Sequence, residues 1–276
     1  MYKLVAIDLD GTLLDTEKNI SEENIEAVRE ALDSGCMVVV CTGRVHNAAA
    51  YFAQIINTPH PVISCNGAVI TDQSTGEVIY DRPLEPETSE RIIDICHRHR
   101  TYFHAYVNNE MYTEVLKYDA LQYMKFNQKT AERFNIKIHL VEDFGADLRK
   151  AGMFVSKFVI ISEDSAKLTL LRKEVEAAGD VEIASSAHNN IEVYRLGVNK
   201  GEALRFLSDK LGIDREYIAA IGDNENDFSM ISYAGLGIAM GNALECIKRI
   251  SRHVTLTNDE NGVAYALKRF ILKPGG

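Results

Sequence analysis

The chain begins with an apolar run that ends in two aspartates one residue apart, Asp8 and Asp10. The run, residues 4–7, is apolar on both faces, which is typical of a central strand in a parallel sheet. Gly11 and Thr12 end this strand, so both carboxylates lie at its carboxyl end, where open α/β sheets bind ligands. Because side chains alternate along a strand, Asp8 and Asp10 leave it on the same side. Neighbouring carboxylates repel unless one holds a proton or a cation lies between them, so the pair suits an oxygen-seeking ion such as Mg²⁺.

After these aspartates the chain alternates helix-like and strand-like segments. A capped helix at 21–35 leads to a second buried strand at 37–41, and this strand–helix–strand order predicts two parallel strands. A helix at 45–56, a third strand at 62–65 and a hairpin at 69–80 follow. The sequence therefore predicts an α/β fold with a Rossmann-like parallel-sheet core.

The alternation breaks where two of the five prolines fall close together, between Arg82 and Pro86. From there to residue 190 the expected strands and helices no longer alternate, which is typical of an α+β unit. The simple alternation returns near Leu196. We therefore predict a core made of residues 1–81 and 191–276, with an inserted α+β cap domain of residues 82–190.

Composition narrows the class of protein. The net charge of −10 argues against nucleic acid or an anionic membrane as a main partner. Five scattered cysteines without a C-x-x-C pair predict reduced thiols and a cytoplasmic protein. No long apolar segment typical of a signal peptide stands at the start, and no apolar run reaches membrane-spanning length. A monomer and a small homo-oligomer both stay open.

Three further polar signals stand at predicted strand or helix ends. Thr42 and Gly43 follow the second strand, where a hydroxyl and a free backbone N–H can cradle an oxyanion. Lys200 opens a helix, where its charge opposes the helix dipole, so an anion is expected nearby. Three acids within residues 223–227 follow a buried strand, as in a metal site. Each signal alone also fits an ordinary helix cap, a solvated lysine or an acidic loop, but their order along one chain is more specific.

Together, the four signals resemble the haloacid dehalogenase (HAD) superfamily of phosphatases. The superfamily's motifs are present as D-x-D-G-T at residues 8–12, Thr42, Lys200 and G-D-x-x-N-D at residues 222–227. The insertion after the third strand is similar to a type IIB cap, and the downstream pattern resembles the Cof-like sugar phosphatases. The resemblance implies a HAD-like fold and a Mg²⁺-dependent phosphatase of small phosphorylated metabolites, with sugar phosphates as the expected class.

The resemblance also implies roles for individual residues. Asp8 is the expected nucleophile, which forms an aspartyl-phosphate, and Asp10 is the expected acid and base. Mg²⁺ is expected on the Asp8 carboxylate, the Asp10 backbone carbonyl and Asp223. The groups expected to bind the phosphoryl oxygens are Thr42, the Leu9 and Gly43 amides, Asn226 and Lys200. Asp227 is expected to hold Lys200 and the waters on the metal.

Two other functions stay open. A phosphomutase of the phosphomannomutase type has the same core and a related cap, but it returns the phosphoryl group to the reoriented substrate. A catalytically inactive phospholigand sensor could keep the fold, although it would not need a nucleophile at Asp8. Specificity is expected to lie in the cap, where most aromatic residues should form a core and one or two, with His104, should face the substrate. These aromatic residues are Tyr102, Phe103, Tyr106, Tyr112, Tyr118 and Tyr123.

Overall fold

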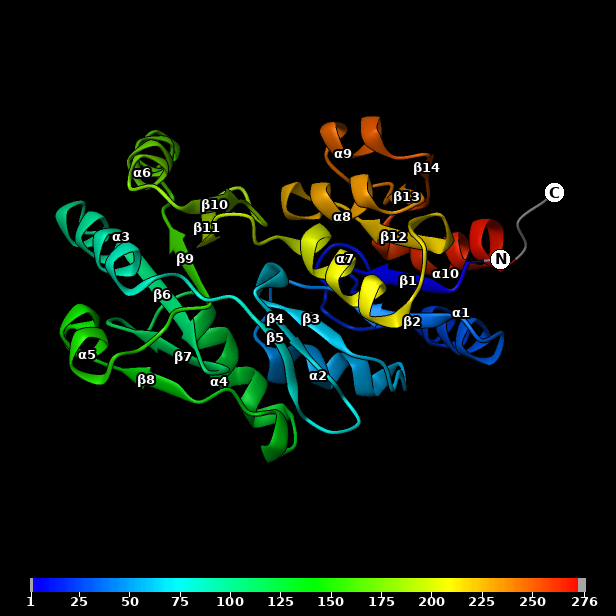
Figure 1. The fold of residues 1–276 in the computed structure, drawn as a ribbon, viewed down its shortest axis with the longest axis horizontal. Helices are drawn as coiled ribbons and strands as arrows, with labels where there is room; N and C mark the ends of the chain where they lie inside the picture. The colour runs from blue at the N-terminus through cyan, green and yellow to red at the C-terminus, as the bar shows by residue number, and fades with distance from the viewer. Residues whose placement is uncertain (1, 273–276) are drawn as a thin grey trace.

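The structure is a computed structural model that describes residues 2–272, and its centre is a five-stranded sheet. The strand order is β14-β13-β12-β1-β2, and all neighbouring strands are parallel (Figure 1). The strands are β1 (Leu4–Ile7), β2 (Met37–Val40), β12 (Ile218–Gly222), β13 (Leu236–Ala239) and β14 (His253–Val254). In β1, β12 and β13 every residue is buried, as expected of a sheet covered on both faces. The predicted parallel-sheet core is confirmed.

Helices surround this sheet in two groups, in which α1 packs against α10 and α7 packs against α8. Their bounds are α1 (Glu22–Asp33), α2 (His46–Ile55), α7 (Lys200–Leu211), α8 (Phe228–Tyr233), α9 (Glu245–Ile250) and α10 (Gly262–Ala266), which a π-helical turn at Leu267–Ile271 extends. The start of α1 is fixed by Ser21, whose side chain accepts the N–H of Asn24 at 3.2 Å. No helix within residues 2–272 is long and apolar enough to cross a membrane.

The third strand runs parallel to the end of β2 and starts a small antiparallel sheet in the order β3-β4-β5. These strands are β3 (Val62–Ser64), β4 (Val69–Thr71) and β5 (Val78–Asp81), so the predicted hairpin is confirmed. A bridge between Cys41 and Ile63 joins β3 to the end of β2. The chain reverses in a 3₁₀ turn at 65–67, where Gly67 has φ +96°. A Cβ on Gly67 would lie 2.3 Å from the Asn199 carbonyl oxygen, so this approach to α7 requires glycine.

A six-stranded sheet in the order β10-β11-β9-β6-β7-β8 forms the inserted unit, and it is antiparallel except between β7 and β8 (Figure 1). The strands are β6 (Tyr102–Val107), β7 (Glu110–Thr113), β8 (Ile138–Leu140), β9 (Lys157–Ile161), β10 (Val181–Ala184) and β11 (Asn190–Arg195). The helices are α3 (Pro86–Arg98), α4 (Asp119–Lys129), α5 (Phe144–Ala151) and α6 (Ser165–Ala177). β8 and α5 were not predicted from the sequence, because both elements are short.

The two faces of the six-stranded sheet pack against different parts of the molecule. On β9, Phe158 and Ile160 belong to an apolar cluster with residues of α3, α5 and α6. Val159 and Ile161 belong to another cluster, which includes the core residue Val45. Because side chains alternate along a strand, every second residue of β9 points at the core. We call this side of the sheet its inner face.

One predicted domain boundary is wrong. The cap was expected to end at residue 190, but β11 pairs with both β9 and β10 and therefore belongs to the six-stranded sheet. A short apolar strand at 191–194 has the same pattern in either sheet, and only the hydrogen bonds distinguish the two. We therefore extend the inserted unit to about residue 195, and its limit near residue 82 stays a prediction.

Candidate active site

Three loops of the core meet at the carboxyl edge of the parallel sheet. Asp8 directly follows β1, Thr42 lies just beyond β2, and Asp223 directly follows β12. Because β1 lies between β2 and β12, Asp8 occupies the middle of this edge. Its backbone N–H donates to the Ile221 carbonyl at 3.1 Å, which extends the β1–β12 pairing to the site itself. Residues from both halves of the core thus face one another.

Lys200 connects two of these loops through hydrogen bonds to a carboxylate on each of them. Its Nζ donates to Asp8 Oδ1 and to Asp227 Oδ1, both at 2.6 Å, and its side chain is fully buried at the start of α7. The other oxygen of Asp227 accepts the backbone N–H groups of Asp223 at 2.8 Å and Asn224 at 3.0 Å. Asp227 therefore holds both the lysine and the backbone of the loop that carries Asp223.

Three carboxylates at this edge could hold a metal ion. One oxygen from each of Asp8, Asp223 and Asp227 lies within 4.8 Å of the other two, and all three residues are buried. The Thr12 hydroxyl orients Asp223 by donating to its Oδ1 at 2.9 Å. Carboxylate oxygens are the ligands that Mg²⁺ prefers, so the donor set fits the predicted ion. Since both oxygens of Asp227 already accept hydrogen bonds, Asp8 and Asp223 are the better placed direct ligands.

The electrostatics of the site also favour a cation. Burial and the charge of Asp227 raise the pKa of Asp8 well above its usual value, in spite of Lys200. Burial and Asp227 also raise the pKa of Asp223 to about 7. One ammonium group therefore does not neutralise three crowded, buried carboxylates. A divalent cation would supply the missing positive charge.

Asp10 has different partners from Asp8. Arg44 donates to its carboxylate through Nε and Nη2, both at 2.7 Å, and Lys18 donates through Nζ at 2.8 Å. Burial alone would raise the pKa of Asp10, but the two cations outweigh burial and hold that pKa well below its usual value. Arg44 and Lys18 were not predicted from the sequence as partners of Asp10. A basic residue directly after the Thr42–Gly43 pair is a signal that could have pointed to Arg44.

A cavity of about 730 Å³ opens over these residues, between the core and the inserted unit. The predicted site residues that line the cavity are Asp8, Asp10, Thr42, Gly43 and Asn226. The other four, Leu9, Lys200, Asp223 and Asp227, are buried at the edge of the sheet. The structure thus gathers the predicted residues around one cavity.

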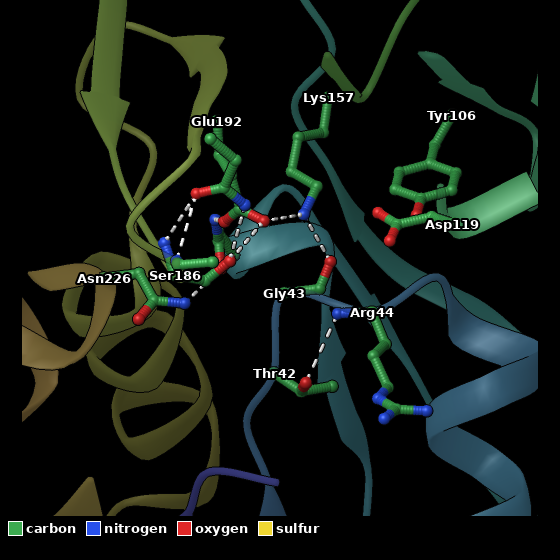
Figure 2. Close-up of polar contacts among 12 residues, drawn as sticks. Thr42, Gly43, Arg44, Tyr106, Asp119, Lys157, Ser186, Glu192 and Asn226 are labelled. Atoms are coloured by element: carbon green, nitrogen blue, oxygen red, sulfur yellow. Dashed lines mark hydrogen bonds and ion pairs between the residues drawn. The ribbon is translucent and has the colours of Figure 1, made fainter. Parts of the chain in front are cut away.

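The inserted unit supplies the opposite wall of the cavity. Asp119, Lys157, Ser186 and Glu192 line it, and Figure 2 shows Lys157 directed at Gly43 in the core loop at 42–44. The sequence analysis missed all four. For Lys157 and Glu192 the available signal was a charged residue beside apolar residues in a predicted strand.

The aromatic residues of the inserted unit divide between its interior and the cavity. Tyr106 and Tyr123 line the cavity, as expected for one or two of them. Phe103 belongs to the outer apolar cluster beneath α3. His104, which was expected to face the substrate, is fully buried and is not among the residues that line this cavity. Burial lowers its pKa to about 3, so its ring is neutral.

A family model of haloacid dehalogenase-like hydrolases matches residues 5–267. The chain belongs to this family. A 5-amino-6-(5-phospho-D-ribitylamino)uracil phosphatase of Bacillus subtilis is 35% identical over 270 residues, which cover 98% of this chain and 96% of that protein. The solved structure of a HAD-like hydrolase from B. subtilis has a TM-score of 0.87 at 33% identity, covering 98% of this chain and all of that one.

A comparison of folds also includes the inserted unit of this HAD protein. A sugar phosphatase of HAD subclass IIB has a TM-score of 0.79 at 23% identity, covering 97% of this chain and 98% of that one. This likeness shows a shared architecture, with the inserted unit included. The chain is therefore a phosphatase of the HAD-like hydrolase family, and the family that the four motifs predicted is confirmed.

Proposed function

We propose that this HAD phosphatase hydrolyses phosphate monoesters of small hydroxylated metabolites, sugar and sugar-alcohol phosphates in particular, with Mg²⁺ and through an aspartyl-phosphate. The observation that carries the proposal is the position of Asp8. Its Oδ1 accepts a hydrogen bond from Lys200, while the residue opens into the cavity beside Thr42 and Asn226. A carboxylate fixed through one oxygen can present the other to a phosphorus atom.

The reaction would proceed in two displacements at phosphorus. Asp8 attacks, and the bond to the leaving oxygen breaks as Asp10 gives that oxygen a proton. For this, Asp10 has to exchange its bonds with Arg44 and Lys18 for a contact with the substrate, because these cations keep it ionised. In the second displacement Asp10 takes a proton from water, whose oxygen attacks phosphorus and releases Asp8 and inorganic phosphate. Mg²⁺, held by Asp8, Asp223 and the Asp10 carbonyl, would supply positive charge against the phosphoryl oxygens.

The remaining predicted residues would hold the phosphoryl group. Its oxygens would accept hydrogen bonds from Thr42, the Leu9 and Gly43 amides, Asn226 and Lys200. Asn226 already donates to Asn66 Oδ1 at 3.1 Å, which sets the orientation of its amide and leaves a second hydrogen for the phosphate. Asp227 would keep Lys200 in place.

The walls of the cavity support a hydroxylated leaving group. Asp119 offers a carboxylate acceptor, whereas Gln122 and Lys125 offer donors. Hydroxyl groups both donate and accept, so they can be matched by such a mixed lining. The B. subtilis relative carries a phosphorylated ribityl chain in the name of its substrate, which is consistent with this class.

The test is phosphate release by the purified protein from a panel of sugar phosphates, sugar-alcohol phosphates, nucleotides and cofactor phosphates, with Mg²⁺ and with excess chelator. We expect release that depends on Mg²⁺ and is fastest on polyhydroxylated substrates. An isomeric phosphate ester formed without release of phosphate would indicate the phosphomutase instead. Binding of phosphate esters without any turnover would indicate the inactive sensor.

A further inference from the structure

A buried ion pair of the inserted unit reaches the phosphate-binding loops of the core. Lys157 Nζ on β9 lies 3.0 Å from Glu192 Oε1 on β11, and the two side chains are only 2% and 6% exposed. Their strand neighbours Phe158 and Val193 belong to the outer apolar cluster, so alternation places both charges on the inner face. A buried ion pair costs free energy unless its remaining atoms are hydrogen-bonded. Here the core supplies those partners.

Lys157 fixes one peptide group of the loop after β2. Its Nζ donates to the Gly43 carbonyl at 2.6 Å, and the N–H of the same peptide group, that of Arg44, donates to Thr42 Oγ1 at 3.2 Å (Figure 2). The carbonyl and N–H of a planar trans peptide point in opposite directions, so holding one directs the other. Because Thr42 Oγ1 accepts this bond, the Thr42 hydroxyl keeps its own hydrogen for a phosphoryl oxygen.

Glu192 fixes the side chain of Asn66, which lies in the turn after β3 and contacts the phosphate-binding residue Asn226. Its Oε2 accepts a hydrogen bond from Asn66 Nδ2, and Asn66 Oδ1 in turn accepts the bond from Asn226 Nδ2 at 3.1 Å. The Ser186 hydroxyl donates to Glu192 Oε1 at 3.0 Å, so the carboxylate is held from the inserted unit as well. The amide of Asn66 is thereby oriented, with its NH₂ toward the carboxylate and its oxygen toward Asn226.

We propose that Lys157 and Glu192 are positioning residues for phosphoryl transfer, which set the Thr42 hydroxyl and the Asn226 amide from the inserted unit. This inference rests on the proposed function, because Thr42 and Asn226 have to bind the phosphoryl group. In the simpler view, the core binds the phosphoryl group and the cap binds only the leaving group. Under the present proposal the cap also shapes the phosphate-binding site. The phosphate site is then complete only while the inner face of the six-stranded sheet lies against the core.

A positioning residue should change the kinetics by the same factor for every leaving group, and this distinguishes it from a residue that contacts the leaving group. Lys157→Met keeps much of the side-chain volume but removes the donor. We expect it to lower kcat/KM by about 10²-fold, and by a similar factor for a sugar phosphate and for acetyl phosphate, which has no hydroxylated leaving group. Calorimetry with inorganic phosphate and Mg²⁺ should show a matching loss of phosphate affinity, without any turnover being required.

Two further variants separate positioning from folding. The double variant Lys157→Met/Glu192→Gln leaves no unpaired buried charge, so it should fold and still show both losses. Arg133→Met is the matched control, because Arg133 Nη2 also donates from the inserted unit to the core, at 2.7 Å to Gln54 Oε1, but lies outside the cavity lining. It should retain wild-type phosphate affinity and turnover.

Two results would overturn the inference. One is wild-type phosphate affinity and wild-type acetyl phosphate hydrolysis in folded Lys157→Met. The other is a loss confined to the sugar phosphate, which would make Lys157 a contact to the leaving group. If the wild-type protein binds phosphate but hydrolyses no monoester, the proposed function fails, and the phosphate affinities alone decide whether Lys157 and Glu192 set the phosphate site.

Discussion

The two large sheets carry their polar side chains in different places. In the five-stranded sheet the candidate catalytic residues follow the strands, as Asp8 follows β1 and Asp223 follows β12. In the six-stranded sheet Lys157 and Glu192 lie within buried strands and reach across to the core. Parallel sheets gather ligands at their carboxyl edge, whereas one face of an antiparallel sheet can be turned toward a partner. The cavity therefore combines reactive groups from strand ends with orienting groups from a sheet face.

The largest expected effect tests the strand-end half of this comparison. Asp8→Asn replaces the proposed nucleophile with an amide, which is a far poorer nucleophile and a weaker metal ligand. We expect turnover to fall by at least about 10³-fold, measured as phosphate release with Mg²⁺. Asp33→Asn, at an exposed position at the end of α1, is the control and should behave as wild type. Activity within about tenfold of wild type would rule out Asp8 as the nucleophile.

Removing the metal tests the residues at the strand ends in a second way, through the pH dependence of the protein's stability. Without metal, the pKa of Asp223 is about 7 in the folded chain against 3.8 as its ordinary value, and the pKa of Asp8 is also raised. The folded chain then binds more protons than the unfolded chain over this window, so the free energy of unfolding falls as pH rises through it. The lowered pKa of Asp10 does not oppose this trend, because Asp10 is already ionised in both states over most of the window. The lowered pKa of His104 does oppose it, but only up to about pH 6.5, where the histidine of the unfolded chain loses its proton.

We therefore expect chelation to abolish turnover and to make the thermal midpoint fall between about pH 6.5 and about pH 8. Added Mg²⁺ should raise the midpoint more at the higher pH, because it neutralises carboxylates that the protein otherwise protonates. Thermal unfolding with and without Mg²⁺ at several pH values measures both effects. A midpoint that rises with pH in chelator would mean that Asp8 and Asp223 are not crowded as the structure shows.

A smaller effect should separate two zones of the inner face. Asp119 lines the cavity but has no described hydrogen bond to the loop at 42–44, so we assign it to the leaving group. Asp119→Asn should lower kcat/KM about tenfold for hydroxylated substrates, since a hydrogen bond to a charged group is weakened, and leave acetyl phosphate unchanged. The exposed Asp94→Asn on α3 is the matched control. An equal loss on acetyl phosphate would place Asp119 with Lys157 among the positioning residues.

The residues of the site that follow core strands could be predicted from the sequence, whereas those on the inner face of the six-stranded sheet could not. The reason is physical. Asp8, Thr42 and Asp223 stand where an apolar run stops, and a strand end in an α/β sheet has a known place relative to ligands. Lys157 and Glu192 stand next to apolar residues in their strands, and alternation shows only that each shares a face with its second neighbours. Alternation does not tell which face meets the core, because that depends on how the two sheets are placed against one another.

The same limit explains the misplaced boundary and the missed partner of Asp10. The strand at 191–194 has an apolar pattern that either sheet could accept, and hydrogen bonding with β9 decides the matter. Arg44 reaches Asp10 across a loop, and no periodicity relates two residues that meet through a turn. Local pattern therefore predicts elements and their ends, whereas contacts between elements far apart in the sequence require the fold.

The smallest expected effect compares two ion pairs at the same seam between core and inserted unit. Arg172 Nη2 on α6 lies 2.6 Å from Glu225 Oε1, and Glu225 directly precedes Asn226, so this pair also touches a phosphate-binding loop. The two side chains are 30% and 38% exposed, in contrast with the buried Lys157–Glu192 pair. Exposed ion pairs contribute little because water and salt screen them.

Arg172→Gln should therefore raise KM by no more than about threefold, leave kcat unchanged, and lose even this effect at high salt. Steady-state kinetics at low and high ionic strength, on a sugar phosphate and on acetyl phosphate, measure the difference. The buried pair acts through the Gly43 peptide and the Asn66 amide, which an exposed guanidinium on Glu225 does not reach. If Arg172→Gln lowered kcat as strongly as Lys157→Met, any contact at the seam would suffice to close the site, and the specific path from Lys157 to Thr42 would be wrong.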